Sequence, residues 1–191
     1  MIKLLFATNN KHKIEEIQSA IGNIIEVVGL KDAGIHIDIA EPHDTLEKNA
    51  SEKSAVIYAM TAMSCFSEDS GLEIDALNGE PGVQSARYSG GSSEDNIDKV
   101  LNKLNNIENR RAKFRTVISL IWGGKEYLFE GICPGKILTE RKGNGGFGYD
   151  AIFMPDGSGQ SFGEMSMEQK NAFSHRKKAA DQLVLFLQQQ H

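Results

Sequence analysis

The stretch that decides the fold runs from residue 67 to residue 91 and reads Ser-Glu-Asp-Ser-Gly-Leu-Glu-Ile-Asp-Ala-Leu-Asn-Gly-Glu-Pro-Gly-Val-Gln-Ser-Ala-Arg-Tyr-Ser-Gly-Gly. It opens on acids and a hydroxyl, continues with an apolar alternation, and turns twice at Gly- and Pro-containing pairs. We expect a strand that starts near Cys65 to end just before Gly71, so that Asp69 and Ser70 stand at a sheet edge facing a crevice. A divalent cation fits such a place. The alternative is an acidic turn that caps itself, which Asp-Ser-Gly also forms.

Length and composition set the bounds for the whole chain. A chain of 191 residues with 40% hydrophobic and 25% charged residues is typical of a soluble globular protein. We therefore expect one domain over residues 1–191, either with a substantial core or with a small additional lobe, and no separable linker. The cysteines, Cys65 and Cys133, have apolar neighbours and are expected to be buried free thiols.

Charge and hydropathy exclude some partners. No apolar run reaches a spanning length and the N-terminal residues lack a signal-peptide pattern, so we expect a cytoplasmic protein with no membrane partner. A net charge of −5 argues against a nucleic-acid polymer as partner, because such proteins usually carry a basic excess. A single nucleotide remains possible.

The N-terminal segment predicts a strand, a polar turn and a helix. Residues 2–7 are apolar, Thr8-Asn9-Asn10 offers capping side chains, and isoleucines then repeat at helical spacing. The unpaired amides and positive dipole end of such a helix attract phosphate oxygens, and Lys13 points back toward the same turn. The alternative is a plain capped surface helix with solvated lysines.

The remaining elements are read from periodicity and capping signals. We expect strands over 24–28, 35–39 and 151–153, and a hairpin of 113–122 and 125–133 that is joined by Gly123-Gly124 and broken at Pro134-Gly135. We expect one helix capped by Thr45, with Lys53 beside its apolar stripe, and another from Ser92 through residue 104. Ser166 and Gln169 form a further capping box, and Ser174 caps the last helix.

Two further segments carry chemistry. Residues 143–150 hold four glycines in six positions, which lets backbone approach a ligand and frees Phe147 or Tyr149 to stack on a flat ring. A flexible hairpin tip is the alternative. His175 and Arg176 fall in the first turn of the last helix, where a cation opposes the helix dipole and calls for a compensating anion or polar ligand.

Five ordered motifs together resemble the inosine/xanthosine triphosphate pyrophosphatase family. They are Thr8-Asn9-Asn10 with Lys13, Asp69-Ser70-Gly71-Leu72, Pro81-Gly82 with Ser85-Ala86-Arg87-Tyr88, Gly145-Gly146-Phe147-Gly148-Tyr149-Asp150, and Ser174-His175-Arg176. The resemblance runs over essentially the whole chain. It implies an elongated mixed α/β fold with a long central sheet flanked by helices, two lobes with a nucleotide cleft between them, and usually a homodimer. It also implies a Mg²⁺-dependent enzyme that hydrolyses ITP, dITP and XTP to the monophosphate and pyrophosphate, a nucleotide-pool cleansing activity.

The resemblance also implies roles for individual residues. Asp69 matches a metal ligand and proton acceptor, and Lys53 a second functional lysine. Positions that match substrate contacts are Thr8, Asn9, Asn10, Lys13, Ser70, Phe147, Gly148, Tyr149, Asp150, Lys170, His175 and Arg176. The chain departs from the family where Lys48 replaces a usual Glu, which leaves Glu41 or Glu47 as the second acidic metal ligand, with Glu41 favoured by position. It also departs at Glu68, where the family often has Asp.

The chemistry of a triphosphate agrees with these residue types. Attack on its α-phosphorus needs a cation and ammonium groups against the developing charge, and a carboxylate to orient water. A P-loop phosphotransferase is disfavoured because Gly-x-x-x-x-Gly-Lys-Ser/Thr does not occur and the glycine-rich segment precedes a strand. A nucleotide-binding regulatory module without turnover, or a pyrophosphatase acting on other modified nucleotides, remains as the alternative.

Overall fold

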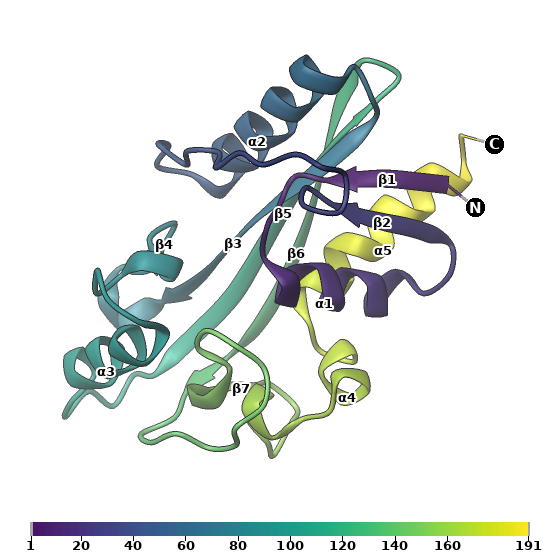
Figure 1. The fold of residues 1–191 in the computed structure, drawn as a ribbon. Coiled ribbons are helices and arrows are strands. Elements are labelled where there is room, and N and C mark those ends of the chain that lie inside the picture. Colours follow the sequence, from purple (N-terminus) through teal and green to yellow (C-terminus); the bar gives the residue numbers. More distant parts are fainter. Residues whose placement is uncertain (1, 191) are drawn as a thin grey trace. The chain divides into compact units, whose positions relative to one another are not determined.

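The computed structural model describes residues 2–190 and is a mixed α/β protein (Figure 1). The strands are β1 (Ile2–Phe6), β2 (Ile25–Gly29), β3 (Cys65–Ile74), β4 (Pro81–Gly82), β5 (Arg111–Trp122), β6 (Lys125–Ile137) and β7 (Phe153–Pro155). The helices are α1 (Lys11–Ile21), α2 (Leu46–Thr61), α3 (Ser93–Lys103), α4 (Met167–Asn171) and α5 (His175–Gln188). The sheet has the order β2-β1-β3-β5-β6-β7, with β4 paired to β3. The predicted fold class, a mixed sheet flanked by helices, is confirmed.

The chain forms two compact units, and strands β3, β5 and β6 each contribute to both. The first unit comprises residues 2–69, 116–131 and 175–190, and the second comprises residues 70–115 and 132–174. Each unit has its own buried hydrophobic residues. Among residues 2–190, no helix has the length and apolar character that crossing a membrane requires.

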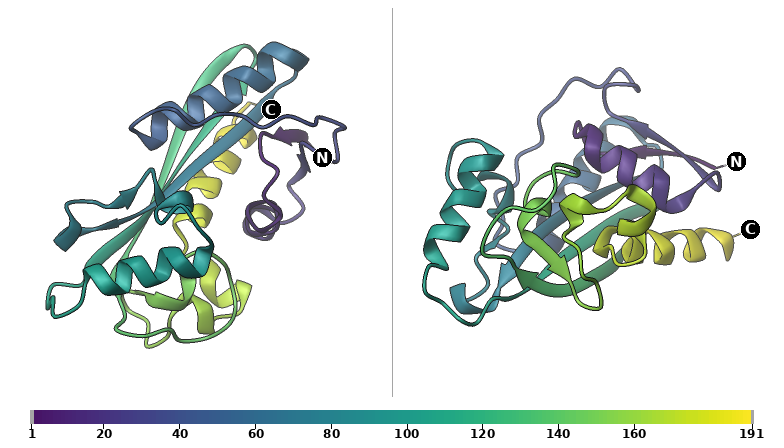
Figure 2. Two further views of the ribbon diagram at one scale, coloured as in Figure 1. Left: turned by 60° about the vertical axis from the view of Figure 1, so that its left-hand side comes forward. Right: turned by 90° about the horizontal axis from the view of Figure 1, so that it is seen from below.

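The core of the first unit lies between β1, β3, β5 and the helices α1 and α5. Helices α1 and α5 pack against each other (Figure 2). Ile17 and Ala20 of α1 belong to the same buried cluster as Ala180 and Leu183 of α5. Strand β1 pairs in parallel with both β2 and β3, which places its carboxyl end beside Phe66 of β3. The pairing positions the residues that follow Phe66 next to the turn that follows β1.

The core of the second unit is built from β3, α3, β5, β6 and β7. Its largest buried side chains are aromatic, and Phe114, Phe153 and Phe162 contact one another with ring centroids 4.6 to 6.1 Å apart. Ser92 and Asp95 form the predicted capping box at the start of α3. Gln169 and Ser166 form the second one at α4.

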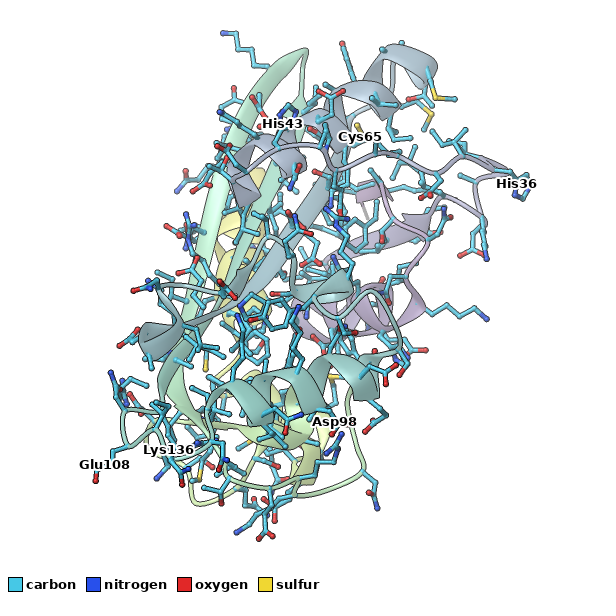
Figure 3. The ribbon with its side chains drawn as sticks, turned by 90° about the vertical axis from the view of Figure 1, so that its left-hand side faces the viewer. His36, His43, Cys65, Asp98, Glu108 and Lys136 are labelled. Atoms are coloured by element: carbon cyan, nitrogen blue, oxygen red, sulfur yellow. The ribbon has the colours of Figure 1, made fainter. Side chains whose placement is uncertain are left out.

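Several sequence predictions are confirmed by the elements. Asn10 and Thr45 cap α1 and α2 with their side chains, the Gly123-Gly124 turn joins β5 to β6, and α5 begins directly after Ser174. Both cysteines are free and buried; Cys65 is labelled in Figure 3.

The predicted strand over residues 35–39 is wrong. The isoleucines of this segment alternate in burial with exposed residues such as His36 (Figure 3), but the segment belongs to no strand. Ile37 uses its carbonyl oxygen to accept the side chain of Asn9 at 3.0 Å, and the isoleucines pack against the buried cluster around Leu30 and Ile57. A half-buried loop therefore produces the same alternation as a half-buried strand.

Two predicted strand ends are also wrong, and one predicted strand begins too early. Strand β3 continues past Gly71 to Ile74, because Gly71 lets β4 approach; a Cβ there would lie 2.5 Å from the carbonyl oxygen of Gly82. Strand β6 continues through Pro134-Gly135, since Gly135 pairs with β7 and the oxygen of Pro134 accepts the amide of Asp156. Residues 150–152 form a 3-10 turn, and β7 starts only at Phe153.

Candidate functional site

The turn between β1 and α1 is built by its own polar side chains. The Asn10 side-chain oxygen accepts the amide of Lys13 at 3.3 Å, and the Thr8 hydroxyl oxygen accepts the amide of Asn10 at 3.2 Å. Asn9 is exposed, and its amide nitrogen donates to Ile37. The turn is thus a rigid helix N-terminus of the kind that accepts phosphate oxygens.

Glu68 and Asp69 lie in the middle of β3 but just beyond the end of β1. The Ala7 amide donates to Phe66 at 2.7 Å, and β1 ends at Phe6, so its pairing to β3 stops before residue 68. Both carboxylates are nevertheless buried. A buried carboxylate is stable only with hydrogen-bond donors or cations around it, which the first unit supplies.

Charged and polar neighbours set the chemistry of Asp69. Its Oδ2 accepts the side-chain amide of Asn49 at 3.2 Å, and its Oδ1 lies 3.6 Å from Lys53 Nζ. Lys53 also donates to the carbonyl oxygen of Glu68 at 2.7 Å and to the carboxylate of Glu41. Burial raises the pKa of Asp69, the Lys53 ammonium opposes that effect, and the Glu41 carboxylate adds to it. A carboxylate with a raised pKa is a better proton acceptor near neutral pH than a solvated one.

Glu68 holds a second set of cations. Arg176 donates from Nε and Nη2 to its two carboxylate oxygens at 2.8 and 3.1 Å, and Lys13 Nζ lies 2.8 Å from the same carboxylate. Burial alone would raise the pKa of Glu68, but Arg176 and Lys13 together hold it well below its usual range. Arg176 is itself buried and also donates to Glu16 of α1. These carboxylates compensate the cation that opposes the dipole at the start of α5.

The second unit brings together a separate group of predicted site residues. The Asp150 carboxylate accepts the Phe147 amide at 2.9 Å and the Lys170 ammonium at 2.6 Å. Lys170 Nζ lies 5.4 Å from the centroid of the Phe147 ring, which is half-buried. Tyr149 is buried in the core, where its hydroxyl donates to the carbonyl oxygen of Ser85 at 2.7 Å and burial raises its pKa. Phe147 therefore remains as the ring of this segment that can stack on a base.

The sequence pattern of the Ham1 family matches residues 4–186. The chain belongs to the Ham1 family. It is 46% identical to the dITP/XTP pyrophosphatase of Flavobacterium johnsoniae, over 96% of each chain, and 45% identical to the dITP/XTP pyrophosphatase of Porphyromonas gingivalis, over 98% of each. The solved structure of the Staphylococcus aureus Ham1 protein superposes with a TM-score of 0.88 at 38% identity, covering 99% of this chain and 100% of that one. The family resemblance read from the five motifs is confirmed.

Within this Ham1-family chain, the predicted residues fall into two groups by unit. The first unit holds Thr8, Asn9, Asn10, Lys13, Glu41, Lys53, Asp69, His175 and Arg176, and the second holds Ser70, Phe147, Gly148, Tyr149, Asp150 and Lys170. His175 is buried at the start of α5, and Ser70 is half-buried in β3 directly after Asp69. The functional roles of all these residues stay predictions.

Sequence reasoning missed three residues that the geometry makes important: Glu68, Asn49 and Glu16. Asn49 was visible only as a polar residue on a helix, and its contact with Asp69 spans 20 positions. Glu16 sits among the isoleucines of α1, and a carboxylate on an apolar helix face was the one signal available for it.

The donors around Asp69 suit a magnesium ion. Mg²⁺ is held by one or two carboxylates together with water and substrate phosphates, so a full protein cage is not needed. The carboxylates of Asp69 and Glu41 both contact Lys53 Nζ, which brings two such ligands to one place. Among residues 2–190, no group of three or more acidic, histidine or cysteine side chains converges as a metal site. Two carboxylates that contact the same ammonium fit the pair of acidic ligands that the family resemblance implies.

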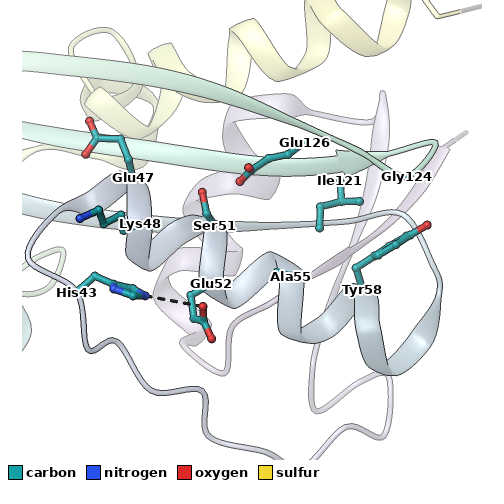
Figure 4. A pocket seen from close by; sticks show the side chains of 10 residues that line it. All are labelled: His43, Glu47, Lys48, Ser51, Glu52, Ala55, Tyr58, Ile121, Gly124 and Glu126. Carbon is teal, nitrogen blue, oxygen red and sulfur yellow. Dashed lines mark ion pairs between the residues drawn. The ribbon is translucent and has the colours of Figure 1, made fainter.

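An open pocket of about 480 Å³ lies elsewhere in the first unit, between α2 and the β5–β6 turn (Figure 4). His43, Glu52, Tyr58 and Glu126 are among the side chains around it, and His43 lies 3.8 Å from Glu52. Glu47, the alternative to Glu41 as second acidic metal ligand, lines this pocket, whereas Asp69, Lys53 and Glu41 do not. Its lining mixes these polar side chains with Ala55 and the buried Ile121, and it is separate from the contacts of Asp69 described above.

Proposed function

We propose that this Ham1-family chain hydrolyses non-canonical purine nucleoside triphosphates to the nucleoside monophosphate and pyrophosphate. It is a hydrolase of phosphoanhydride bonds. The observation that carries the proposal is that Lys13 and Lys53 contact two neighbouring buried acids, Glu68 and Asp69, beside the N-terminus of a helix. The names of the relatives, dITP/XTP pyrophosphatase, support ITP, dITP and XTP as the substrates.

In the reaction, Asp69 accepts a proton from the water that attacks the α-phosphorus. The new bond joins that water oxygen to phosphorus, and the bond from phosphorus to the oxygen that bridges to the β-phosphate breaks, so pyrophosphate leaves. Asn49 and Lys53 hold the carboxylate of Asp69 in place for this step, at 3.2 and 3.6 Å. General-base action of this kind contributes roughly 10² to 10⁴ in rate.

Two sets of groups handle the charge of the triphosphate. Lys13 and the amides at the start of α1 bind the phosphate oxygens, and Thr8, Asn9 and Asn10 shape that turn. Asp69 and Glu41 would hold Mg²⁺, which when bound supplies positive charge against the phosphate oxygens. Lys53, which already contacts both carboxylates, acts chiefly by positioning them.

The base is recognised at its C6 oxygen. Hypoxanthine and xanthine both carry an oxygen there, whereas adenine carries an amino group that would set a donor against a donor. Phe147 stacks on the ring, while Gly148 and the backbone of Tyr149 lie beside it, and Asp150 with Lys170 holds this segment in shape. His175, Arg176 and Ser70 complete the substrate contacts. A site that hydrogen-bonds one group rejects its mismatch by roughly 10⁴.

The proposal is tested by measuring pyrophosphate released from ITP, dITP, XTP, ATP and GTP, each with and without Mg²⁺. We expect release from the first three that is lost when the cation is removed. A protein that binds ITP and releases no pyrophosphate would be a regulatory module, and preference for a different modified nucleotide would redirect the substrate assignment. We further propose a cytoplasmic homodimer, for which the mass in solution, measured by light scattering, is the test.

A further inference from the structure

Glu16 is a buried carboxylate at the interface of two helices. It is 4% exposed and lies on the face of α1 that also carries Ile17 and Ala20, which pack against α5. It accepts a hydrogen bond from Arg176 in the first turn of α5, and Arg176 is 2% exposed. The contact joins residues 160 positions apart, so both side chains meet only when the two helices pack.

A buried ion pair is a costly way to join two helices. Removing two charges from water costs several kcal/mol each, and well-packed apolar residues at such places are often as stable or more stable. The two helices also pack through apolar residues such as Ala20 and Leu183. The pair between Glu16 and Arg176 therefore calls for an explanation other than stability.

The explanation lies in what Arg176 does with its remaining donors. It donates hydrogen bonds to both carboxylate oxygens of Glu68 at 2.8 and 3.1 Å, and the Glu68 carboxylate in turn lies 2.8 Å from Lys13 Nζ. The result is a row of alternating charges, from Glu16 to Arg176 to Glu68 to Lys13, all within the first unit. Only the last member reaches solvent, because the Lys13 side chain is 18% exposed.

We infer that Glu16 is a positioning residue that sets the place of Lys13, and with it the binding of the pyrophosphate part of the substrate. The inference rests on the proposed function for the role of Lys13. Glu16 shares the charge of Arg176, so Glu68 keeps enough negative charge unpaired by Arg176 to hold the ammonium of Lys13. Without the carboxylate at position 16, Glu68 is drawn to Arg176 alone and Lys13 loses its anchor beside the α1 turn.

The first test compares Glu16→Gln with Glu15→Gln. The neighbouring Glu15 is exposed and lies 3.9 Å from His12, so its variant controls for charge removal on α1. The probes are the Ki of inorganic pyrophosphate as a product inhibitor and the KM and kcat for ITP. Loss of a residue that orients a ligand-binding side chain from behind, as the residues behind the ligands do at metal sites, typically costs about tenfold to a hundredfold in binding or activity. For Glu16→Gln we expect both the Ki and the KM to rise roughly tenfold with kcat within a factor of about three, and Glu15→Gln to match the wild type.

The second test asks whether Glu16 acts through Lys13. In a Lys13→Ala background, Glu16→Gln should leave the Ki of pyrophosphate unchanged, because the group it positions is gone. Equal effects of Glu16→Gln with and without Lys13 would overturn the inference. So would a KM for ITP that rises while the Ki of pyrophosphate stays constant, because that result would place the effect at the base.

The design separates this inference from the proposed function. Wild-type protein that releases no pyrophosphate from ITP would refute the function, whereas a wild type that turns over together with an unchanged Glu16→Gln variant refutes only the inference. If Glu16→Gln fails to fold, Glu16→Asp takes its place, since it keeps the charge one methylene further from Arg176. An intermediate rise in the Ki of pyrophosphate then supports the inference, and an unchanged value overturns it.

Discussion

Replacing Asp69 by Asn separates the chemistry of this position from its packing. The amide has nearly the shape of the carboxylate, so it fits between Asn49 and Lys53 in the buried site. The new NH₂ group faces the Asn49 amide or the Lys53 ammonium, and both of these are hydrogen-bond donors. A buried donor that is left without an acceptor costs about 1–3 kcal/mol. The loss of a buried negative charge beside Glu41 offsets part of this cost, because burial and Glu41 both raise the pKa of Asp69 in the folded protein. Lys53 keeps Glu41 and the carbonyl of Glu68 as partners. We therefore expect folding stability to fall by no more than about 2 kcal/mol.

The effect on turnover should be far larger than the effect on stability. An amide accepts no proton from water and binds Mg²⁺ without a charge, so kcat for ITP should fall by roughly 10² to 10⁴. Pyrophosphate release at saturating ITP measures the rate, and thermal unfolding measures the fold. Asp156→Asn is the matched control, because that carboxylate is exposed and paired only with Arg111 among the contacts of its unit. An Asp69→Asn variant that melts normally and turns over within about threefold of the wild type would refute the assignment of Asp69 as the base.

Four further outcomes follow from the contacts. Lys13→Ala should raise the KM for ITP by roughly tenfold to a hundredfold, with little change in melting temperature, because a charge-assisted hydrogen bond is lost at a partly exposed site. Unchanged kinetics would show that Lys13 is a surface lysine without a role in binding. Arg176→Ala should destabilise the fold by about 3–5 kcal/mol in urea unfolding, because two buried carboxylates lose their cation, and an effect below 1 kcal/mol would contradict the network. Gly71→Ala should lower the melting temperature strongly, since its Cβ would meet the Gly82 carbonyl oxygen at 2.5 Å, with circular dichroism as the readout. Burial raises the pKa of the Cys65 thiol to about 11, so at pH 8 it stays protonated and should react with a thiol reagent only after unfolding; fast labelling of folded protein would contradict this.

Local signals were sufficient for most of the secondary structure. The capping boxes at Ser92 and Ser166 satisfy helix amides through residues three positions away, and the Gly123-Gly124 turn needs only its own backbone freedom, so their chemistry is complete within a few residues. The ends of β3 and β6 were missed for the opposite reason. A glycine or proline ends a strand unless a distant strand makes use of it, as β4 does at Gly71 and β7 does at Gly135.

The same distinction between local and long-range signals holds for the residues of the candidate site. Asp69, Lys53 and the Asn10 turn were identified because their residue types and family spacing are informative on their own. Their partners were not, because Asn49, Glu16 and Glu68 are ordinary polar residues until the fold brings them to Asp69 and Arg176. The burial of Tyr149 and its hydrogen bond to Ser85 were likewise invisible in the sequence, where an aromatic ring beside glycines indicates only that it could stack on a base.

The start of α5 shows how a local conflict points to distant structure. A basic first turn opposes the helix dipole, which led us to expect an external anion near Arg176. The first unit supplies that anion from within, because Glu68 and Glu16 together take three of the five guanidinium N–H groups, on Nε, Nη1 and Nη2. Because Arg176 makes these contacts, we expect base selectivity to depend more on backbone amides and on His175 than on its guanidinium. Under the proposed function, Arg176 would act mainly by holding Glu68, and through it Lys13, in place.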